Sequence, residues 1–366
     1  MNILRVASDL YPTVVGGLGV HVHEMSKEQA RLGYNVTVYT TKTDDRPVQE
    51  YGDGYKIVRF RSVVNLMGNS IVPSMFFKLI NAKNDFDIVH AHSHLFLSTN
   101  LCAIVKKIGS PPLVITNHGL ISQTVPMWVQ EVYIPTIARW TFESADRILC
   151  YTEEEKTMLK DLNIDSEKIK VIHNGTDTRL FSPRENEGGG NQILWVGRFT
   201  EGKGVDYLID AFSILVRERP NLKLLMVGWG PLKEDVKLRI RNLGLMKSII
   251  IREFIPNTRL PGVYQNSDVF VLPSIQEGVP RTLLEAMASG VPVVCTELPQ
   301  LVDVVDGCGL MVPSRDSQAL ADAISRILDD NELAQKLGKN GRINVVRNYS
   351  WEDTVKKTIE VYGELM

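Results

Sequence analysis

The sequence predicts an α/β protein with two domains, each built on a parallel sheet covered by helices. Short runs rich in Val and Ile alternate with longer segments of helical periodicity along the whole chain, the pattern of parallel strands joined by crossover helices. The 366 residues exceed one ordinary core and fit two domains of common size. A polar stretch with three consecutive glycines, SPRENEGGGNQ, separates the two sets of strands and predicts a hinge linker at 182–191.

The strand pattern sets the expected domain limits. We expect an N-terminal Rossmann-like domain at 1–181 and a C-terminal one at 192–349, with their parallel sheets facing each other across a cleft. Residues 350–366 predict a terminal helix, because Ser350 is a favourable cap and apolar side chains follow on one face. The predicted strands are ILRVAS, NVTVYT, YKIVRF, DIVHAH, LVITNH, RILCYT and KIKVIH, then QILWVG, KLLMVG, SIIIRE, DVFVLP and PVVCTE.

Composition excludes several classes of protein. With 44% hydrophobic and 23% charged residues the chain is globular, and a net charge of -2 gives no reason to expect a nucleic-acid partner. The four cysteines show no metal-type spacing and favour a reducing compartment. The chain lacks a long apolar stretch at its start, so we expect a cytoplasmic protein. The apolar run IVPSMFFKLI suggests peripheral contact with the inner face of a membrane.

A pair of glutamates stands in the loop and helix after the strand DVFVLP. Glu277 lies on the loop, and Glu285 lies on a helix expected to run roughly from Pro280 to Gly290. Carboxylates accept paired hydrogen bonds from vicinal hydroxyls, so one acid can hold a sugar and the other a ribose. The alternative is that both are solvated surface residues.

Two cations flank glycines in WVGRFTEGKG, between a strand and the start of the next helix. Backbone amides and the positive end of a helix attract phosphate, and Arg198 and Lys203 can neutralise charge that develops on a diphosphate leaving group. The alternative is that they are ordinary surface cations.

A glycine-rich loop follows the first strand. Gly16, Gly17 and Gly19 precede a helix and allow the backbone to approach a ligand closely. The spacing lacks G-x-G-x-x-G, which disfavours a dinucleotide site.

Histidines mark the ends of two strands in the first half. His118, in TNHG, lies at the carboxyl end of a strand where ligands bind. His90, His92 and His94 could suggest zinc, but residues two apart on a strand share one face and more often pack or form hydrogen bonds. We therefore expect no metal.

In their order and separation these stretches resemble the retaining nucleotide-sugar transferases of glycosyltransferase family 4, whose two-domain architecture is called GT-B. The resemblance spans nearly the whole chain. It rests on the E-x(7)-E pair within EGVPRTLLEAMASGVPVV, with VGR and EGKG before it, GGLG near the start, and HNGTDTRLF. It implies retaining transfer of a hexose from a UDP- or GDP-linked donor to a lipid, glycan or small-molecule acceptor, without a metal or other cofactor.

The resemblance also implies a role for each candidate residue. Glu277 and the backbone after it would bind the transferred sugar, Glu285 the ribose, and the two cations the departing diphosphate. The terminal helix would cross back onto the first domain. Catalytic roles fall to Arg198, Lys203, His118 and Glu277, and donor-binding roles to Gly16, Gly17, Gly278, Val279, Glu285 and Asn174.

Two other functions remain open at this point. An NDP-sugar epimerase or a hydrolase on the same scaffold needs the donor site but no acceptor. A non-catalytic nucleotide-sugar-binding protein would keep the donor site without turnover.

Overall fold

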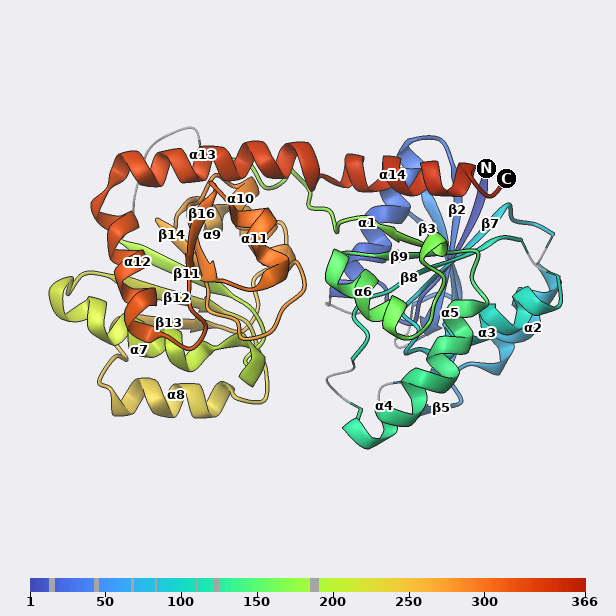
Figure 1. The fold of residues 1–366 in the computed structure, drawn as a ribbon, viewed down its shortest axis with the longest axis horizontal. Helices are drawn as coiled ribbons and strands as arrows, with labels where there is room; N and C mark the ends of the chain where they lie inside the picture. Colours follow the sequence, from blue (N-terminus) through green and yellow to red (C-terminus); the bar gives the residue numbers. More distant parts are fainter. Residues whose placement is uncertain are drawn as a thin grey trace. The chain divides into compact units, whose positions relative to one another are not determined.

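The computed structural model describes residues 1–12, 17–42, 46–66, 69–82, 84–109, 111–121, 125–184 and 191–366 (Figure 1). The chain forms two compact units. The N-terminal unit contains residues 1–174 and 351–366, and the C-terminal unit contains residues 175–350. Each unit has its own parallel sheet and its own cores, so each is described by itself.

The N-terminal unit contains an eight-stranded sheet. Its strands are β1 (Asn2–Val6), β2 (Asn35–Lys42), β3 (Gln49–Gly52), β4 (Tyr55–Arg61), β7 (Ile88–His92), β8 (Leu113–Thr116), β9 (Arg147–Cys150) and β10 (Ile169–Val171), and β5 (Val64–Leu66) and β6 (Asn69–Ile71) form a separate pair. The order is β10-β9-β8-β7-β1-β2-β4-β3, parallel except for β3. Because the chain runs outward from β1 and returns to β7 on its other side, the topological switch point lies between β1 and β7.

Helices cover this sheet, and two apolar clusters form its cores. The C-terminal helix α14 packs against α1, with Val355 and Tyr362 buried, so it belongs to the N-terminal unit (Figure 1). In α2, the apolar run of the sequence buries Met75 and Leu79 and leaves Phe77 64% exposed. The helices are α1 (Gly17–Arg31), α2 (Pro73–Asn81), α3 (Leu97–Lys107), α4 (Met127–Tyr133), α5 (Arg139–Glu143), α6 (Glu153–Asp161) and α14 (Trp351–Gly363), with a π-helical turn at Ile134–Ala138 and a 3-10 turn at Ser166–Lys168.

The C-terminal unit contains a six-stranded sheet in which all strands are parallel. Its strands are β11 (Gln192–Val196), β12 (Lys223–Val227), β13 (Ile249–Arg252), β14 (Val269–Leu272), β15 (Val293–Thr296) and β16 (Gly309–Val312). The order is β13-β12-β11-β14-β15-β16. The chain runs from β11 to β13 and returns to β14, so the switch point of this sheet lies between β11 and β14.

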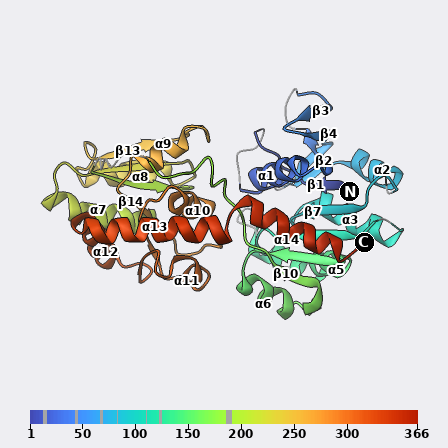
Figure 2. The same ribbon diagram turned by 90° about the horizontal axis from the view of Figure 1, so that it is seen from above.

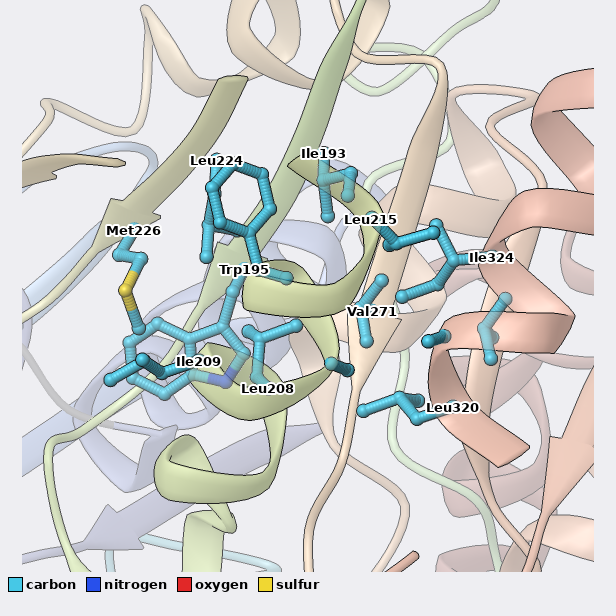
Figure 3. Packing of buried hydrophobic residues seen from close by; sticks show 14 of the residues in the cluster. Ile193, Trp195, Leu208, Ile209, Leu215, Leu224, Met226, Val271, Leu320 and Ile324 are labelled. Carbon is cyan, nitrogen blue, oxygen red and sulfur yellow. The ribbon is translucent and has the colours of Figure 1, made fainter. Parts of the chain in front are cut away.

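Helices lie on both faces of the second sheet (Figure 2). Side chains of β11, α7 and α12 gather in one core, among them Trp195, Leu208 and Leu320 (Figure 3). Their burial follows from the helical spacing of apolar residues in α7. The helices are α7 (Val205–Glu218), α8 (Lys233–Asn242), α9 (Leu260–Gln265), α10 (Arg281–Ala288), α11 (Pro299–Val305), α12 (Ser317–Asp329) and α13 (Asn331–Asn348), with a 3-10 turn at Glu201–Lys203.

The passage between the units differs from the expected hinge. The chain changes unit between 174 and 175 and again between 350 and 351, whereas the polar composition suggested 182–191. Residues 185–190 lie outside the described residues. Before them, Phe181 is buried against Tyr264, with ring centroids 5.7 Å apart, and the Ser182 carbonyl accepts a hydrogen bond from Gln265. These contacts hold the segment 175–184 in the C-terminal unit.

Candidate functional site

Two of the predicted site residues meet at the switch point of the C-terminal sheet. Lys203 follows β11 and Glu277 follows β14, and the carboxyl ends of these neighbouring parallel strands meet at one edge. The Lys203 ammonium pairs with Glu277 Oε1, which also accepts a hydrogen bond from Ser274 Oγ at 2.9 Å. The Gln300 amide donates to the Glu277 backbone carbonyl. The acid is therefore held from three sides, while its side chain stays 10% exposed.

A glycine brings the two loops together. Gly204 has φ +60°, and a Cβ placed there would lie 1.9 Å from the Pro273 carbonyl oxygen. Glycine is therefore required here for two reasons: other residues rarely adopt this left-handed backbone conformation, and a side chain would clash with the Pro273 carbonyl. Beside it, the Gly202 carbonyl accepts hydrogen bonds from the backbone amides of Ile275 and Gln276. These contacts set the distance between Lys203 and Glu277.

We expect Gly204→Ala to lower the free energy of unfolding of the C-terminal unit by at least about 2 kcal/mol. The energetic cost of a left-handed alanine adds to the cost of its clash with the Pro273 carbonyl. Gly202→Ala is the matched control, since a Cβ at Gly202 would meet nothing within 4 Å. Urea unfolding of both variants measures the difference. Equal stability of the two variants would contradict the close approach.

Arg198 lies in the same loop, over an aromatic ring. Its guanidinium carbon is 5.1 Å from the centroid of the Trp229 ring, and the side chain is exposed. Gly228 and Gly230 flank Trp229, and a Cβ at either would lie within 2.4 Å of a backbone oxygen of Gly197 or Phe199. The loop after β12 therefore packs on the loop after β11, and its Trp229 ring holds the Arg198 cation by stacking.

Glu285 lies on α10, next to the loop that carries Glu277. As predicted, this helix follows Pro280 and ends before Gly290, which has φ +71°. The carboxylate is buried and accepts hydrogen bonds from Arg281 Nη2 at 2.8 Å and from the Tyr264 hydroxyl at 3.0 Å. Burial raises the pKa of Glu285, and its two donors oppose that shift.

The remaining donor-binding candidates lie in two places. Gly278 and Val279 follow Glu277 in the loop, the first exposed and the second buried. Asn174 lies in the N-terminal unit, where its side-chain oxygen is 3.0 Å from His21 Nδ1. Gly17 begins α1 and is exposed, and a Cβ there would meet nothing within 4 Å. Gly16 lies outside the described residues.

His118 belongs to a histidine cluster at the carboxyl ends of β7 and β8, two interior strands of the N-terminal sheet. It follows β8, its Nε2 is 3.1 Å from His92 Nδ1, and its Nδ1 is 3.0 Å from the Tyr151 hydroxyl. The rings of His90 and His92 stack with centroids 4.5 Å apart. Burial lowers the pKa of His90, His92 and His118 well below the usual value, and the Arg5 charge adds to that shift.

Three histidines of the cluster are close enough to share a metal ion, but they are not the triplet His90, His92 and His94 of the HAHSH sequence. Ring nitrogens of His21, His92 and His118 all lie within 4.8 Å of one another. His94 lies apart and packs against Phe142, with centroids 4.8 Å apart. His92 and His118 already use their facing nitrogens in a hydrogen bond to each other.

Sequence reasoning missed the residues that hold the candidates in place. Arg5 and Tyr151 contact the histidines, and Tyr264 and Arg281 hold Glu285. For Arg281 the sequence does contain a signal, because it precedes Glu285 by four residues on a predicted helix, a spacing that allows an ion pair. The others are joined by tertiary contacts.

Comparison with known proteins identifies the family. A model described as Glycosyltransferase Family 4 matches residues 15–180, and one described as Glycosyl transferases group 1 matches residues 177–344. The chain belongs to glycosyltransferase family 4. Its family relatives include a glycosyltransferase of Methanocaldococcus jannaschii, 27% identical over 99% of this chain and 98% of that protein. Another is the MMP alpha-(1->4)-mannosyltransferase of Mycolicibacterium hassiacum, 27% identical over 96% and 95%.

Solved structures show the same fold. Sucrose-phosphate synthase from Thermosynechococcus elongatus matches with a TM-score of 0.83 and 24% identity, covering 100% of this chain and 98% of that one. Anabaena HepE in complex with UDP and glucose matches with a TM-score of 0.81 and 19% identity over the full length of both chains. The two Rossmann-like units therefore form the GT-B fold, as predicted. None of the described helices has the length and apolar character that a membrane crossing requires.

Proposed function

We propose that this glycosyltransferase is a retaining, metal-independent hexosyltransferase that uses a UDP- or GDP-linked sugar and a hydroxyl acceptor on a glycan, lipid or small molecule. The Lys203–Glu277 pair at the β11/β14 switch point carries the proposal. In an open parallel sheet this is the place where a ligand binds, and here it combines a fixed cation with a fixed carboxylate. HepE, with UDP and glucose bound in its crystal structure, supports a nucleoside diphosphate donor.

Each charged group then has a chemical task. Lys203 and Arg198 stabilise the diphosphate as it departs, which supplies without a metal the positive charge that the transition state needs. Glu277, with the backbone of Gly278 and Val279, binds the transferred sugar, and Glu285 binds the ribose hydroxyls. From the N-terminal unit, Gly16, Gly17 and Asn174 bind the donor, and His118 contacts the sugar.

Product analysis tests the reaction. Thermal-shift measurements with UDP-, GDP- and ADP-hexoses first select the donor, and the selected donor is then incubated with candidate acceptors. We expect a glycosylated acceptor whose anomeric configuration matches the donor. An epimerised donor, hydrolysis that added acceptors leave unchanged, or binding without turnover would replace the proposal by an epimerase, a hydrolase or a binding protein.

Calorimetry with the nucleoside diphosphate alone tests the donor site. We expect Glu285→Gln to weaken binding about tenfold or more, because hydrogen bonds to a charged acceptor contribute about 1.5–3 kcal/mol. Glu332→Gln, at an exposed acid at the start of α13, is the control and should leave binding unchanged. Thermal unfolding shows whether the buried variant still folds. Unchanged affinity in a folded Glu285→Gln protein would remove this residue from the donor site.

A further inference from the structure

A buried guanidinium lies at the switch point of the N-terminal sheet. Arg5 of β1 is the register partner of His90 on β7, and its side chain is fully buried. Its Nη1 is 3.2 Å from His90 Nδ1 and 2.8 Å from His92 Nε2, and its Nη2 donates to Gln29 Oε1 at 2.5 Å. Within the described ranges it forms no ion pair with a carboxylate. A permanently charged group thus faces two imidazoles.

The charge of Arg5 decides where the histidine protons lie. A guanidinium stays protonated and has only donors, so the ring nitrogen of His92 that faces it must be an unprotonated acceptor. The proton of neutral His92 is therefore on Nδ1, which faces His118 Nε2 at 3.1 Å. His118 Nε2 must then accept, so its own proton is on Nδ1, 3.0 Å from the Tyr151 hydroxyl. Donors and acceptors alternate from Arg5 to Tyr151.

The neighbouring ring of His90 also accepts a hydrogen bond from Arg5. His90 Nδ1 faces Arg5 and also the hydroxyl of Tyr362 on α14. With two donors at Nδ1, the proton of His90 lies on Nε2 and is donated to Thr116 Oγ1 at 2.6 Å. The two rings that contact Arg5 therefore have defined and opposite tautomers.

We propose that Arg5 is a positioning residue that acts through His92 to hold His118 as the neutral Nδ1–H tautomer, which presents a hydrogen-bond donor to a sugar hydroxyl oxygen. The inference rests on the proposed function, in which His118 contacts the sugar. A nitrogen that carries this proton cannot act as a general base. The substrate hydroxyl takes the place of the Tyr151 oxygen as the acceptor.

The positions of the ring protons also argue against a metal at the histidine cluster. Coordination by His92 needs a lone pair on one ring nitrogen. Its Nε2 lone pair is directed to Arg5, and its Nδ1 carries the proton that His118 accepts. A cation would also bring positive charge next to a buried guanidinium.

Long-range ¹H–¹⁵N spectra of histidine-labelled protein test the proposal directly. In the unmodified protein we expect His92 and His118 to be neutral with the proton on Nδ1, assigned through His92→Gln and His118→Gln. In Arg5→Met the donor at His92 Nε2 is lost, so His92 and His118 should populate both tautomers. His23, which contacts Tyr55 at 2.8 Å, is the internal control and should not change.

Three results would overturn the proposal. One is an Nε2–H or doubly protonated His118 in the unmodified protein, which requires no variant to fold. Another is an unchanged His118 tautomer in folded Arg5→Met. The third is stoichiometric zinc binding that shifts His21, His92 and His118 together.

Activity gives a second readout. We expect Arg5→Met to lower kcat about tenfold and to leave the affinity for the nucleoside diphosphate unchanged, with no further loss when it is combined with His118→Ala. Additive losses would contradict action through His118. Failure of the proposed function would show as the absence of transfer by the unmodified protein, whereas the tautomer result does not depend on transfer.

Discussion

Replacing Lys203 by alanine is expected to lower kcat/KM about 10²- to 10³-fold, the loss that follows removal of one preorganised group that stabilises developing charge. Lys203 is held at Glu277 by the close approach of Gly204, so its ammonium is in position before a donor binds. Arg198→Ala should give a loss of similar size, since Trp229 holds that cation in place. Steady-state kinetics with the selected donor and acceptor measures both effects.

Matched variants separate the catalytic role of these two cations from a general effect of charge. Lys237→Ala removes a lysine whose side chain is 43% exposed and pairs with Glu234, three residues away on α8, and should leave kcat/KM unchanged. Lys203→Arg keeps the charge and should restore part of the lost rate. Undiminished turnover in both alanine variants would remove the two cations from the mechanism, and a parallel loss in Lys237→Ala would point to a general charge effect.

Acid is expected to destabilise the N-terminal unit far more than the C-terminal unit. Burial lowers the pKa of His94 to about 4 and the pKa values of His90 and His92 well below 6.5. In the unfolded chain these groups take up protons near pH 6.5, so their contribution to stability is complete above that pH and is lost as the pH falls below it. These three histidines alone cost roughly 4 kcal/mol between about pH 7.5 and about pH 5.5. His118, whose pKa burial also lowers, adds to the loss in the same direction.

The chain contains its own control for this pH dependence. All seven histidines lie before residue 175, so the C-terminal unit should change little over the same range. Pulse proteolysis in urea, with the fragments assigned by mass spectrometry, reports on the two units separately. Equal acid losses in both units, or histidines that titrate near pH 6.5 in the native protein, would contradict the neutral cluster.

Local patterns sufficed for the fold and for the positions of the main candidates. Every strand expected from a run of Val and Ile is present, and α10 begins and ends where Pro280 and Gly290 predict. Two kinds of strand were missed. The edge strand β3 at Gln49–Gly52 has little apolar content, and β16 at Gly309–Val312 is a run of only four residues without the repeated Val and Ile of the predicted strands. The boundary between the units was predicted at 182–191 instead of between 174 and 175. The polar composition of that stretch does not reveal that Phe181, just before it, packs in the C-terminal core.

What the sequence determined by itself is the architecture and the set of charged groups at the strand ends, because hydrophobic periodicity and glycine or proline punctuation act over a few residues. The tertiary structure alone decided which groups meet. Arg5 reaches histidines 85 and 87 residues away, and Lys203 reaches Glu277 across 74 residues. Such contacts depend on strand order and close backbone approach, which bring together residues that no local spacing connects.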